Sequence, residues 1–584
     1  MSRKLLALLL AAGILRAEAA VTVNDADGWF ESAYVEWTPV EGATGYNVYC
    51  QASGSSEWNR LDNELVRCYG TYGRADAVGL AAGTYVLKVV PVYASGEGTS
   101  DAALTGELSV RAHNRDGFAH TGYTSGIGAY NDDGTLKDGA RVLYVNASTA
   151  KTVTLDMVEK AGKAAVTHIG LQSILKAYEK GAETRPLAIR IVGTIEAGDM
   201  DSFESKAEGL QIKGKNNNIA MQVTIEGIGR DAGIKGFGIL LRNAVSVELR
   251  NFAVMLCMDD CISIDTDNRH LWVHNLDLFY GQTGSASDQV KGDGTIDIKA
   301  DSKYITVSYN HFWDSGKSSL CGMKSESGPN WITYHHNWFD HSDSRHPRIR
   351  TMSVHVWNNY FDGNAKYGVG VTTGSCAFVD RNYFRNPYKP MMSSLCGTDA
   401  TGKGTFSSEK PGFIKAYGNV FAETNTNGLK LLYIPWTKGS MSFDAYEVDA
   451  PSERVPATVV DGDATYNNFD TDSTFYSYAA DSPADIPAIL MGSYGAGRLQ
   501  HGDFQWTFDN STEDANDAII PALKSALNAY TSTLLGYDWS QAVGVTKVAA
   551  DAAESPMYDL QGRRIQNHTP EGFVIRDGKT LLRK

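Results

Sequence analysis

The chain has 584 residues, too many for one ordinary compact domain, although a fold of stacked repeats can absorb the extra length. Apolar residues make up 42% and charged residues 21%, which supports a well-packed core and argues against disorder. The formal net charge of −15 excludes a general nucleic-acid binder, which needs a basic face, but it allows a polyanionic substrate held by a local cluster of cations.

The N-terminus has the pattern of a secretory signal peptide, which we place at residues 1–19. A basic start is followed by an apolar segment at residues 5–15 and by Ala17-Glu18-Ala19, a small-x-small cleavage site. The apolar segment is shorter than the roughly 20 residues of a membrane span, and no other stretch of the sequence reaches that length. We therefore expect a protein that is secreted or held at the cell surface.

Residues 20–112 consist of short alternating segments separated by turn signals, which predicts a small β-sandwich. A core Trp37 followed by the strand Gly45–Tyr49, and a later strand at residues 83–93, resemble the fibronectin type III pattern. The resemblance covers this segment only and implies a spacer or a binding module.

Seven cysteines are an odd number for an exported protein. Cys50 and Cys68 fall in the first domain, where they either pair as a disulfide or remain buried thiols. The others have no zinc-ligand spacing, so we expect buried small apolar residues at Cys257, Cys261, Cys321, Cys376 and Cys396.

We place the second domain at residues 113–540. After a Gly- and Asp-rich linker, the segment 168–181 is amphipathic with apolar residues at i, i+3, i+4 and i+7, and Gly181 suits a helix C-cap. A helix ahead of many short strands predicts a cap over the open end of a solenoid.

A short signature, Asn-x-Phe, recurs in one register from residue 310 onward, mostly at intervals of 22 to 27 residues. Apolar residues stand five and three places before each Asn, as inward-facing strand residues would. We expect each Asn to end its strand in a left-handed conformation and to hydrogen-bond to neighbouring copies, while the Phe rings stack along the axis. The copies are Asn310-His-Phe312, Asn337-Trp-Phe339, Asn359-Tyr-Phe361, Asn382-Tyr-Phe384 and Asn419-Val-Phe421.

One coil per repeat predicts an all-β fold, a right-handed parallel β-helix preceded by a small β-sandwich. Scattered strands of an ordinary sandwich do not predict five matched registers. The tail at residues 541–584 resembles the C-terminal sorting segments of type IX secretion substrates, and a plain β-hairpin is an equal alternative.

The register also predicts where charged side chains meet. Lys317 follows Asn310 by seven residues and Arg345 follows Asn337 by eight, so both leave the same flank of adjacent coils, about 4.8 Å apart. An isolated arginine is more often a surface salt-bridge residue, and only the surrounding constellation favours a functional role for this one.

Three aspartates are expected on the same flank. Asp293 and Asp297 lie an even number of residues apart and face outward together, and Asp260 belongs one coil earlier. Carboxylates on neighbouring coils repel one another unless a cation neutralises them. Calcium accepts several oxygens in irregular geometry, whereas magnesium requires stricter octahedra and nothing here suggests a softer metal.

Five motifs of this region are Asp260-x-Ile-x-Ile, Asp293-Gly-x-x-Asp297-Ile-Lys, Tyr304-Ile-Thr-Val-Ser-Tyr-Asn310, Lys317-x-x-Leu-x-Gly322 and Arg345-x-Pro-Arg-x-Arg350. Together they resemble the pectate lyases of polysaccharide lyase family one, over roughly residues 140 to 430. The resemblance implies a monomeric enzyme that cleaves polygalacturonate, an acidic polysaccharide, by calcium-assisted β-elimination.

The resemblance also implies roles for individual residues. The calcium ligands would be Asp260, Asp293 and Asp297, and Arg345 would be the base that removes the C5 proton. Substrate carboxylates would be held by Lys317 and Arg350, with Arg348 beside them. Because arginine has a pKa above 12, we expect the neighbouring cations to lower the pKa of Arg345 by repulsion.

The sequence departs from the family pattern at two places. Trp272-Val-His-Asn275 stands where the family usually has Trp-Ile-Asp-His, and Met258 stands where a second aspartate often precedes Asp260. Asp259, next to this position, is the candidate to replace the missing acid. The departure therefore concerns how tightly the metal binds rather than whether a metal binds.

Three alternatives remain. Asp259-Asp260 also resembles the paired acids of polygalacturonases, which hydrolyse with two carboxylates, but the Gly-His-Gly motif of that family is absent. A non-catalytic polysaccharide-binding protein would have lost the acids or the base, and a pectin lyase would not need the calcium acids.

Overall fold

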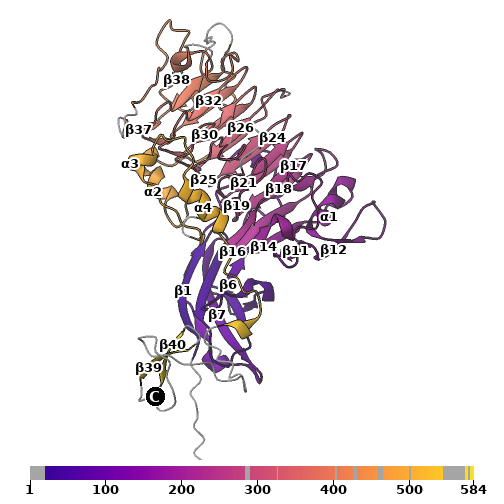
Figure 1. Cartoon of the computed structure of the whole chain (residues 1–584). Helices are drawn as coiled ribbons and strands as arrows, with labels where there is room; N and C mark the ends of the chain where they lie inside the picture. Colours follow the sequence, from indigo (N-terminus) through magenta and orange to yellow (C-terminus); the bar gives the residue numbers. More distant parts are fainter. Residues whose placement is uncertain are drawn as a thin grey trace, which may run out of the picture.

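A computed structural model describes residues 20–282, 290–324, 326–400, 404–424, 430–456, 464–498 and 501–542, and the backbone of 572–576 and 579–583. The chain forms a small β-sandwich followed by a long stack of coils (Figure 1). The predicted signal peptide and most of the predicted tail lie outside the described residues. Within the described part, no helix is long and apolar enough to cross a membrane.

Two antiparallel sheets form the sandwich and share one apolar core that contains Trp37, Val48 and Val89. Cys50 and Cys68 are free thiols buried in this core, so the structure favours the second of the two alternatives. The first sheet has the order β1-β2-β6-β5, with β1 (Thr22–Trp29), β2 (Ser32–Thr38), β5 (Val66–Cys68) and β6 (Gly73–Val78). The second has the order β10-β7-β3-β4, with β3 (Gly45–Ala52), β4 (Asn59–Arg60), β7 (Gly83–Tyr93) and β10 (Leu108–Val110), and β8 (Gly96–Glu97) and β9 (Ala103–Leu104) also pair with β7.

The coils form a parallel β-helix, as predicted, with three faces of parallel strands. The first face contains β11 (Arg141–Val145), β14 (Leu187–Glu196), β16 (Val223–Lys235), β18 (Val245–Arg250), β21 (Arg269–His274), β24 (Lys303–Ser308), β27 (Ile332–His335), β30 (Ser353–Trp357), β33 (Cys376–Asp380), β36 (Phe413–Tyr417) and β38 (Tyr446–Glu447). The second contains β19 (Ala253–Met255), β22 (Asp277–Leu278), β25 (His311–Trp313), β28 (Trp338–Asp340), β31 (Tyr360–Asp362), β34 (Tyr383–Arg385) and β37 (Val420–Ala422). The third contains β15 (Leu210–Lys213), β17 (Ile239–Arg242), β20 (Ile262–Asp265), β23 (Ile296–Ile298), β26 (Ser319–Cys321), β29 (Arg348–Ile349), β32 (Val369–Val371) and β35 (Met391–Ser393).

The predicted asparagine ladder runs along the turn between the first and second faces. The amide of Asn310 donates from Nδ2 to Oδ1 of Asn337 at 3.0 Å, and the same bond repeats from Asn337 to Asn359, from Asn359 to Asn382 and from Asn382 to Asn419. One detail of the prediction is wrong: the left-handed backbone belongs to the residue before each ladder Asn, for example Tyr309 at φ 53° and His336 at φ 53°. The turn is thus completed before the Asn, whose side chain is left to bind its neighbours.

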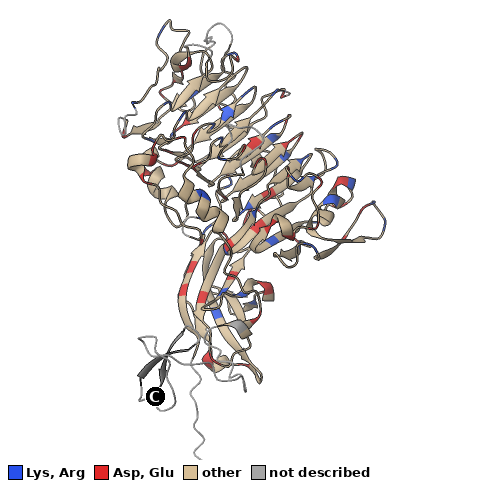
Figure 2. Ribbon diagram, in the orientation of Figure 1, with Lys and Arg blue, Asp and Glu red and all other residues tan. Residues whose placement is uncertain are grey.

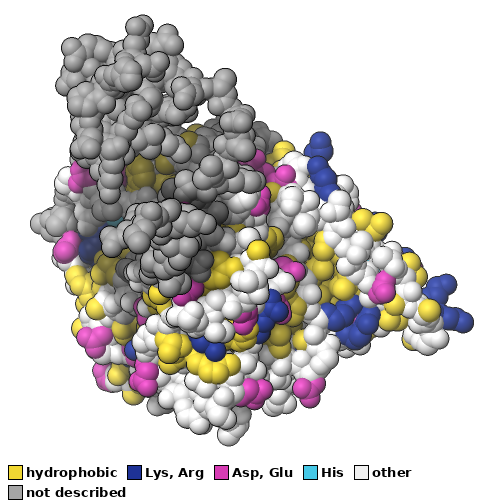
Figure 3. Space-filling model, turned by 90° about the horizontal axis from the view of Figure 1, so that it is seen from below, with side chains coloured by type: hydrophobic (Ala, Val, Ile, Leu, Met, Phe, Trp, Pro, Cys, Tyr) yellow, Lys and Arg dark blue, Asp and Glu magenta, His cyan; other side chains and the backbone are white. Residues whose placement is uncertain are grey.

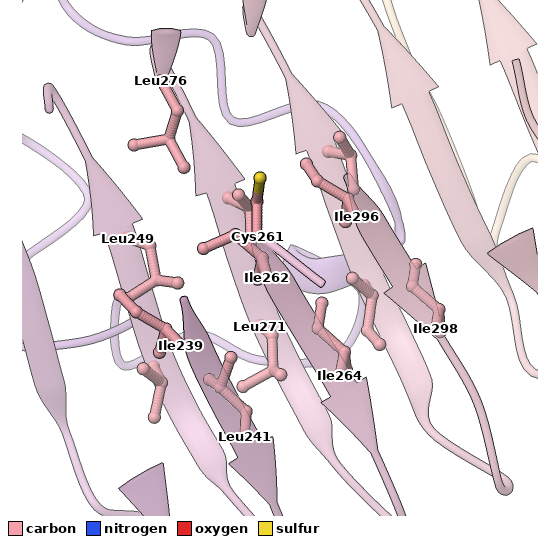
Figure 4. Packing of buried hydrophobic residues seen from close by; sticks show 14 of the residues in the cluster. Ile239, Leu241, Leu249, Cys261, Ile262, Ile264, Leu271, Leu276, Ile296 and Ile298 are labelled. Atoms are coloured by element: carbon pink, nitrogen blue, oxygen red, sulfur yellow. The ribbon is translucent and has the colours of Figure 1, made fainter. Parts of the chain in front are cut away.

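The Phe of each signature stacks on the next inside the coils. Ring centroids are 4.7 Å apart between Phe312 and Phe339, 5.2 Å between Phe339 and Phe361 and 4.2 Å between Phe361 and Phe384. Aliphatic side chains fill the rest of the interior, and isoleucines of successive third-face strands lie over one another in register (Figure 4).

A hairpin of β12 (Thr154–Met157) and β13 (Val166–Ile169) precedes the helix α1 (Leu171–Lys176). The helix begins three residues later than the periodicity predicts, because His168 pairs within the hairpin. A 3₁₀ turn continues it to Gly181, which has the predicted left-handed C-cap. Leu171, Ile174 and Leu175 are buried against the first coils, as expected of a cap.

Residues 464–542, here called the C-terminal strap, return along the second face and reach the sandwich (Figure 1). The strap carries α2 (Ile486–Leu490), α3 (Asn510–Glu513) and α4 (Pro521–Ala529), and Leu523 and Leu527 are buried against the coils. At its end Trp539 stacks on Trp37 of the sandwich, with centroids 5.9 Å apart. The sandwich core is therefore completed by a residue from the opposite end of the chain.

Near the C-terminus β39 (Gly572–Arg576) and β40 (Lys579–Arg583) pair antiparallel, which does not separate the two alternatives for the tail. Seen from below, the described surface mixes basic, acidic and apolar side chains (Figure 3).

Candidate active site

Four turns at one edge of the third face carry the predicted site residues. Asp260 precedes β20, Asp293 precedes β23, Lys317 precedes β26 and Arg345 precedes β29. Backbone hydrogen bonds join these turns: Cys261 N donates to Gly294 O at 3.1 Å, Thr295 N to Lys317 O at 3.0 Å and Ser319 N to Arg345 O at 2.7 Å. The parallel register thus places the residues on successive rungs of one wall, where acidic and basic residues follow one another along the coils (Figure 2).

Three carboxylates cluster on this wall. Asp259, Asp260 and Asp293 each offer an oxygen, and these oxygens all lie within 4.8 Å of one another. Gly294 makes the approach possible, because a Cβ at this position would stand 2.7 Å from Asp260 Oδ1 and 2.4 Å from Asp297 Oδ1. Asp297, in β23, thus lies close to Asp260 through the same glycine, and Asp259 is an acid of this cluster in addition to the three predicted ones.

Like charge and burial hold protons on part of this acidic cluster. Burial, with repulsion from Asp260 and Asp293, raises the pKa of Asp259 to about 6. Burial and the charge of Asp260 raise the pKa of Asp297 to about 7, although Lys299 and Arg345 oppose the shift. A carboxylate cluster that is short of positive charge in this way stabilises a bound cation.

Lys299 is the internal counter-ion that the sequence analysis did not single out. Its Nζ lies 2.8 Å from Asp260 Oδ2 and 3.9 Å from Asp297 Oδ2. Burial alone would lower the pKa of this lysine, but Asp297 and Asp260 raise it. The sequence could have indicated Lys299 as a site residue, because it directly follows β23 and stands two residues after Asp297.

Beside the acids lies a cavity of about 510 Å³ with a cationic lining. Lys317, Arg345 and Arg348 line it, and Lys317 Nζ is 3.5 Å from Asp293 Oδ1, which links the cavity to the acids. Arg345 is partly buried and has a left-handed backbone at φ 63°. The guanidinium of Arg345 thus belongs to the cavity wall, close enough to the acids to act on the pKa of Asp297.

Arg350 is not among the described residues that line the cavity. Its Nε lies 3.6 Å from Glu409 Oε2, and Arg348 Nη2 lies 3.0 Å from Oε1 of the same glutamate. Glu409 therefore pairs with both arginines, of which Arg348 lines the cavity.

Two further lysines line the cavity and were not predicted. Lys291 is buried and lies 2.6 Å from both Asp314 and Asp343. Lys366 is half exposed, 3.5 Å from Asp343 and 3.0 Å from Asp517 of the C-terminal strap. The strand register could have predicted the position of Lys366. Arg348 pairs with Gly370, so the coil after Arg345 presents Lys366 at the same edge.

Three histidines that lie close in sequence to Arg345 are packing residues. His335, His336 and His346 are fully buried, and burial lowers the pKa of each. His346 is held between Ser342 Oγ at 3.1 Å and Tyr367 O at 2.8 Å.

Comparisons with protein families and with known proteins find similarity to pectate lyases. A family model described as pectate lyase matches residues 110–480. A pectate trisaccharide-lyase of Bacillus licheniformis is 27% identical over 344 residues, covering 58% of this chain and 83% of that protein. Pectate lyase 3 of Pectobacterium atrosepticum is 30% identical over 278 residues, covering 43% of this chain and 72% of that protein. A solved pectate lyase from Bacillus sp. N165 in complex with trigalacturonate is 21% identical with a TM-score of 0.42, covering 65% of this chain and 98% of that one.

Proposed function

Because the chain belongs to the pectate lyase family, we propose that it cleaves polygalacturonate by β-elimination in the cationic cavity and leaves an unsaturated sugar at the new end. The observation that carries the proposal is the alignment on consecutive rungs of an acidic trio, Lys317 and Arg345. A polyanion needs cations for its carboxylates, and an elimination needs a base beside an acidified C–H bond.

The acidic trio fits a calcium ion. Its donors are all carboxylate oxygens on separate turns, without sulfur or imidazole, which is the set that a hard cation with irregular coordination prefers. Asp259, Asp260 and Asp293 would hold the ion, and Asp297 would serve as a further ligand or as support for Asp260. Bound calcium would draw electron density from the substrate carboxylate at C6 and so make the proton on C5 more acidic.

Arg345 is the proposed base. It lines the cavity one rung beyond Lys317. Arg348 shares the rung and the motif, and the resemblance to the family assigns the role of base to the first arginine of that motif, Arg345. It would take the C5 proton, after which the electron pair of the C–H bond forms the C4–C5 double bond and the C4–O bond breaks. The leaving oxygen keeps the electron pair of that bond and takes a proton from water to become the hydroxyl of the new reducing end. Neutral arginine is a strong base once formed, so turnover should grow as pH rises.

Lys317 and Arg348 would bind carboxylates of neighbouring sugar units in the cavity. Arg350 would contribute after it leaves Glu409, or by holding Glu409 so that Arg348 is positioned. A point charge such as lysine tolerates several carboxylate positions, whereas an arginine fork selects one.

The remaining parts suggest an exported, monomeric enzyme. We propose that residues 1–19 are a signal peptide and that residues 20–112 are a fibronectin type III-like module fixed against the catalytic domain 113–540. The fixation is supported by the buried ion pair of Arg250 with Glu31 at 3.1 Å and by Trp539 in the sandwich core. The tail 541–584 would serve sorting or end as a hairpin.

The test is incubation of the full chain with polygalacturonate, with and without a chelator. Unsaturated product that absorbs in the ultraviolet identifies a lyase, whereas new reducing ends without absorbance identify a hydrolase. Asp293→Asn should lose the calcium response, and Asp472→Asn, an exposed aspartate in a turn, is the matched control. Absence of any unsaturated product from the wild-type chain would overturn the proposal.

A further inference from the structure

Two cysteines flank the acidic turn. The Sγ atoms of Cys257 and Cys261 are 2.8 Å apart, and between the two residues stand Met258, Asp259 and Asp260. Both thiols are buried, with 1% and 2% of each residue exposed, whereas Met258 is 44% exposed. The turn therefore carries two carboxylates, one half-buried and one buried, between two residues whose sulfur atoms meet.

The surroundings of the two sulfur atoms are apolar. Cys257 and Cys261 belong to the interior cluster of the coils, and Figure 4 shows the Cys261 sulfur among Leu249, Ile262 and Leu276. A thiol is a weak hydrogen-bond donor and a weak acceptor, so a thiol pair in such a place gains little from its contact. The separation is within about 1 Å of a disulfide bond length of roughly 2.05 Å.

Cys261 Sγ also lies 3.9 Å from Phe279 O, and two other buried cysteines have shorter contacts with oxygen. Cys321 Sγ lies 3.4 Å from the hydroxyl of Tyr334, and Cys376 Sγ lies 3.6 Å from Thr465 O. The thiol–thiol contact is thus a particular feature of the acidic turn.

We propose that Cys257 and Cys261 form an intrachain disulfide when the chain folds in an oxidising compartment, and that this bond fixes the turn carrying Asp259 and Asp260. Each thiol loses one proton and one electron, and a small disulfide such as oxidised glutathione accepts both electrons and both protons to give two molecules of glutathione. Oxidation precedes burial, because the native turn shields both sulfur atoms.

The bond would act on the metal site through the backbone. Asp259 is held against Asp260 and Asp293 although their charges repel, so without a cation the turn is under pressure to open. A cross-link between the two ends of the turn removes open conformations from the ensemble, and a ligand that binds the closed form then binds more tightly. This consequence rests on the proposed calcium site, whereas the disulfide itself does not.

Peptide mass tests the disulfide without reference to calcium. Trypsin cleaves after Arg250 and Arg269, and the peptide between them contains Cys257 and Cys261 as its only cysteines. The full chain is folded with oxidised glutathione, denatured with an alkylating reagent and digested. We expect this peptide to be unalkylated and lighter than its reduced form by the mass of two hydrogen atoms. Alkylation of both cysteines would overturn the proposal.

Calcium titration calorimetry of the oxidised and reduced full chain tests the effect on the turn. We expect reduction to weaken calcium binding by about tenfold, Cys257→Ala to bind as the reduced chain does in both conditions, and Cys376→Ala, a buried cysteine in another cluster, to respond as the wild type does. Equal affinity in the two redox states would overturn the positioning role. Absence of calcium binding in both states would overturn the proposed metal site and leave the peptide result unaffected.

Discussion

His341 holds the C-terminal strap to the β-helix through charge, and this makes the stability of the fold depend on pH. The imidazole is buried, with Nδ1 2.6 Å from Asp340 Oδ1 and Nε2 3.1 Å from Asp514 Oδ1 of the strap. Burial alone would lower the pKa of His341, but the hydrogen bond to Asp340 and the ion pair with Asp514 raise it to about 10. Replacement of His341 by Gln removes this positive charge with little change in size.

The raised pKa of His341 decides how its contribution to stability changes with pH. An unfolded histidine has a pKa of about 6.5, so the stabilisation from His341 is complete below that pH and is lost as pH rises through the folded value near 10. Between pH 7 and 9 the folded chain keeps a proton that the unfolded chain has released. The stability advantage of the wild type over His341→Gln should therefore shrink by about 1.4 kcal/mol per pH unit, or about 2.7 kcal/mol over the interval.

Urea unfolding at pH 7, 8 and 9 measures this difference. His346→Gln is the matched control, because burial lowers the pKa of His346 to about 3, so this ring is neutral in the folded chain and largely neutral in the unfolded chain throughout the interval. Its stability difference from the wild type should stay constant. A constant difference for His341→Gln as well would refute the reasoning, because the imidazole would then be neutral in the folded chain.

Four other predictions concern the site and the strap. Activity should rise into the alkaline range, and an acid optimum in the wild type would contradict an arginine base. Arg345→Lys should lower kcat by about 10²-fold or more at unchanged thermal stability. Chelation should abolish turnover and calcium should restore it, and turnover that persists in chelator would remove the metal from the mechanism. Lys366→Met should raise KM several-fold with kcat nearly unchanged, because this lysine lines the cavity away from the acids; a matching fall in kcat would assign it a role in the transition state. Trp539→Ala should destabilise the sandwich by about 3–5 kcal/mol in thermal unfolding without a change in kcat, and an unchanged stability would show that the strap does not complete the core.

The β-helix was predictable because its signals are periodic. Each Asn-x-Phe copy repeats the same inward and outward alternation, so five registers fix the order of the coils and the edge at which Lys317 and Arg345 emerge. The left-handed residue was assigned one position too late, because asparagine tolerates that conformation and the pattern alone does not separate it from its predecessor.

Aperiodic parts of the site were harder to predict. Asp259 and Asp260 are adjacent in a turn, where the inward and outward alternation of a strand does not apply and does not predict which carboxylate faces the site. The structure brings both carboxylates close to Asp293. Asp517 of the strap contacts Lys366, and Trp539 of the strap contacts the sandwich core. Both contacts join residues far apart in the sequence, which no local sequence pattern predicts. The contact of Cys257 with Cys261 likewise depends on the shape of one turn.

Among the described residues of the β-helix, two clusters of acids are close enough to hold an ion, and their charge balance says which of them suits a metal. On the second face, Asp340, His341 and Asp362 are also close enough to hold an ion, but the protonated His341 stands among these acids and Arg385 bonds to Asp362. That cluster already contains its cations, and a metal would have to displace them from a buried place at high cost. On the third face, Lys299 alone sits between Asp260 and Asp297, while burial and repulsion keep the pKa of Asp259 at about 6. The deficit of positive charge is at the edge that also carries Lys317 and Arg345, so the proposed calcium ion and the proposed base would lie at the same edge of the coils.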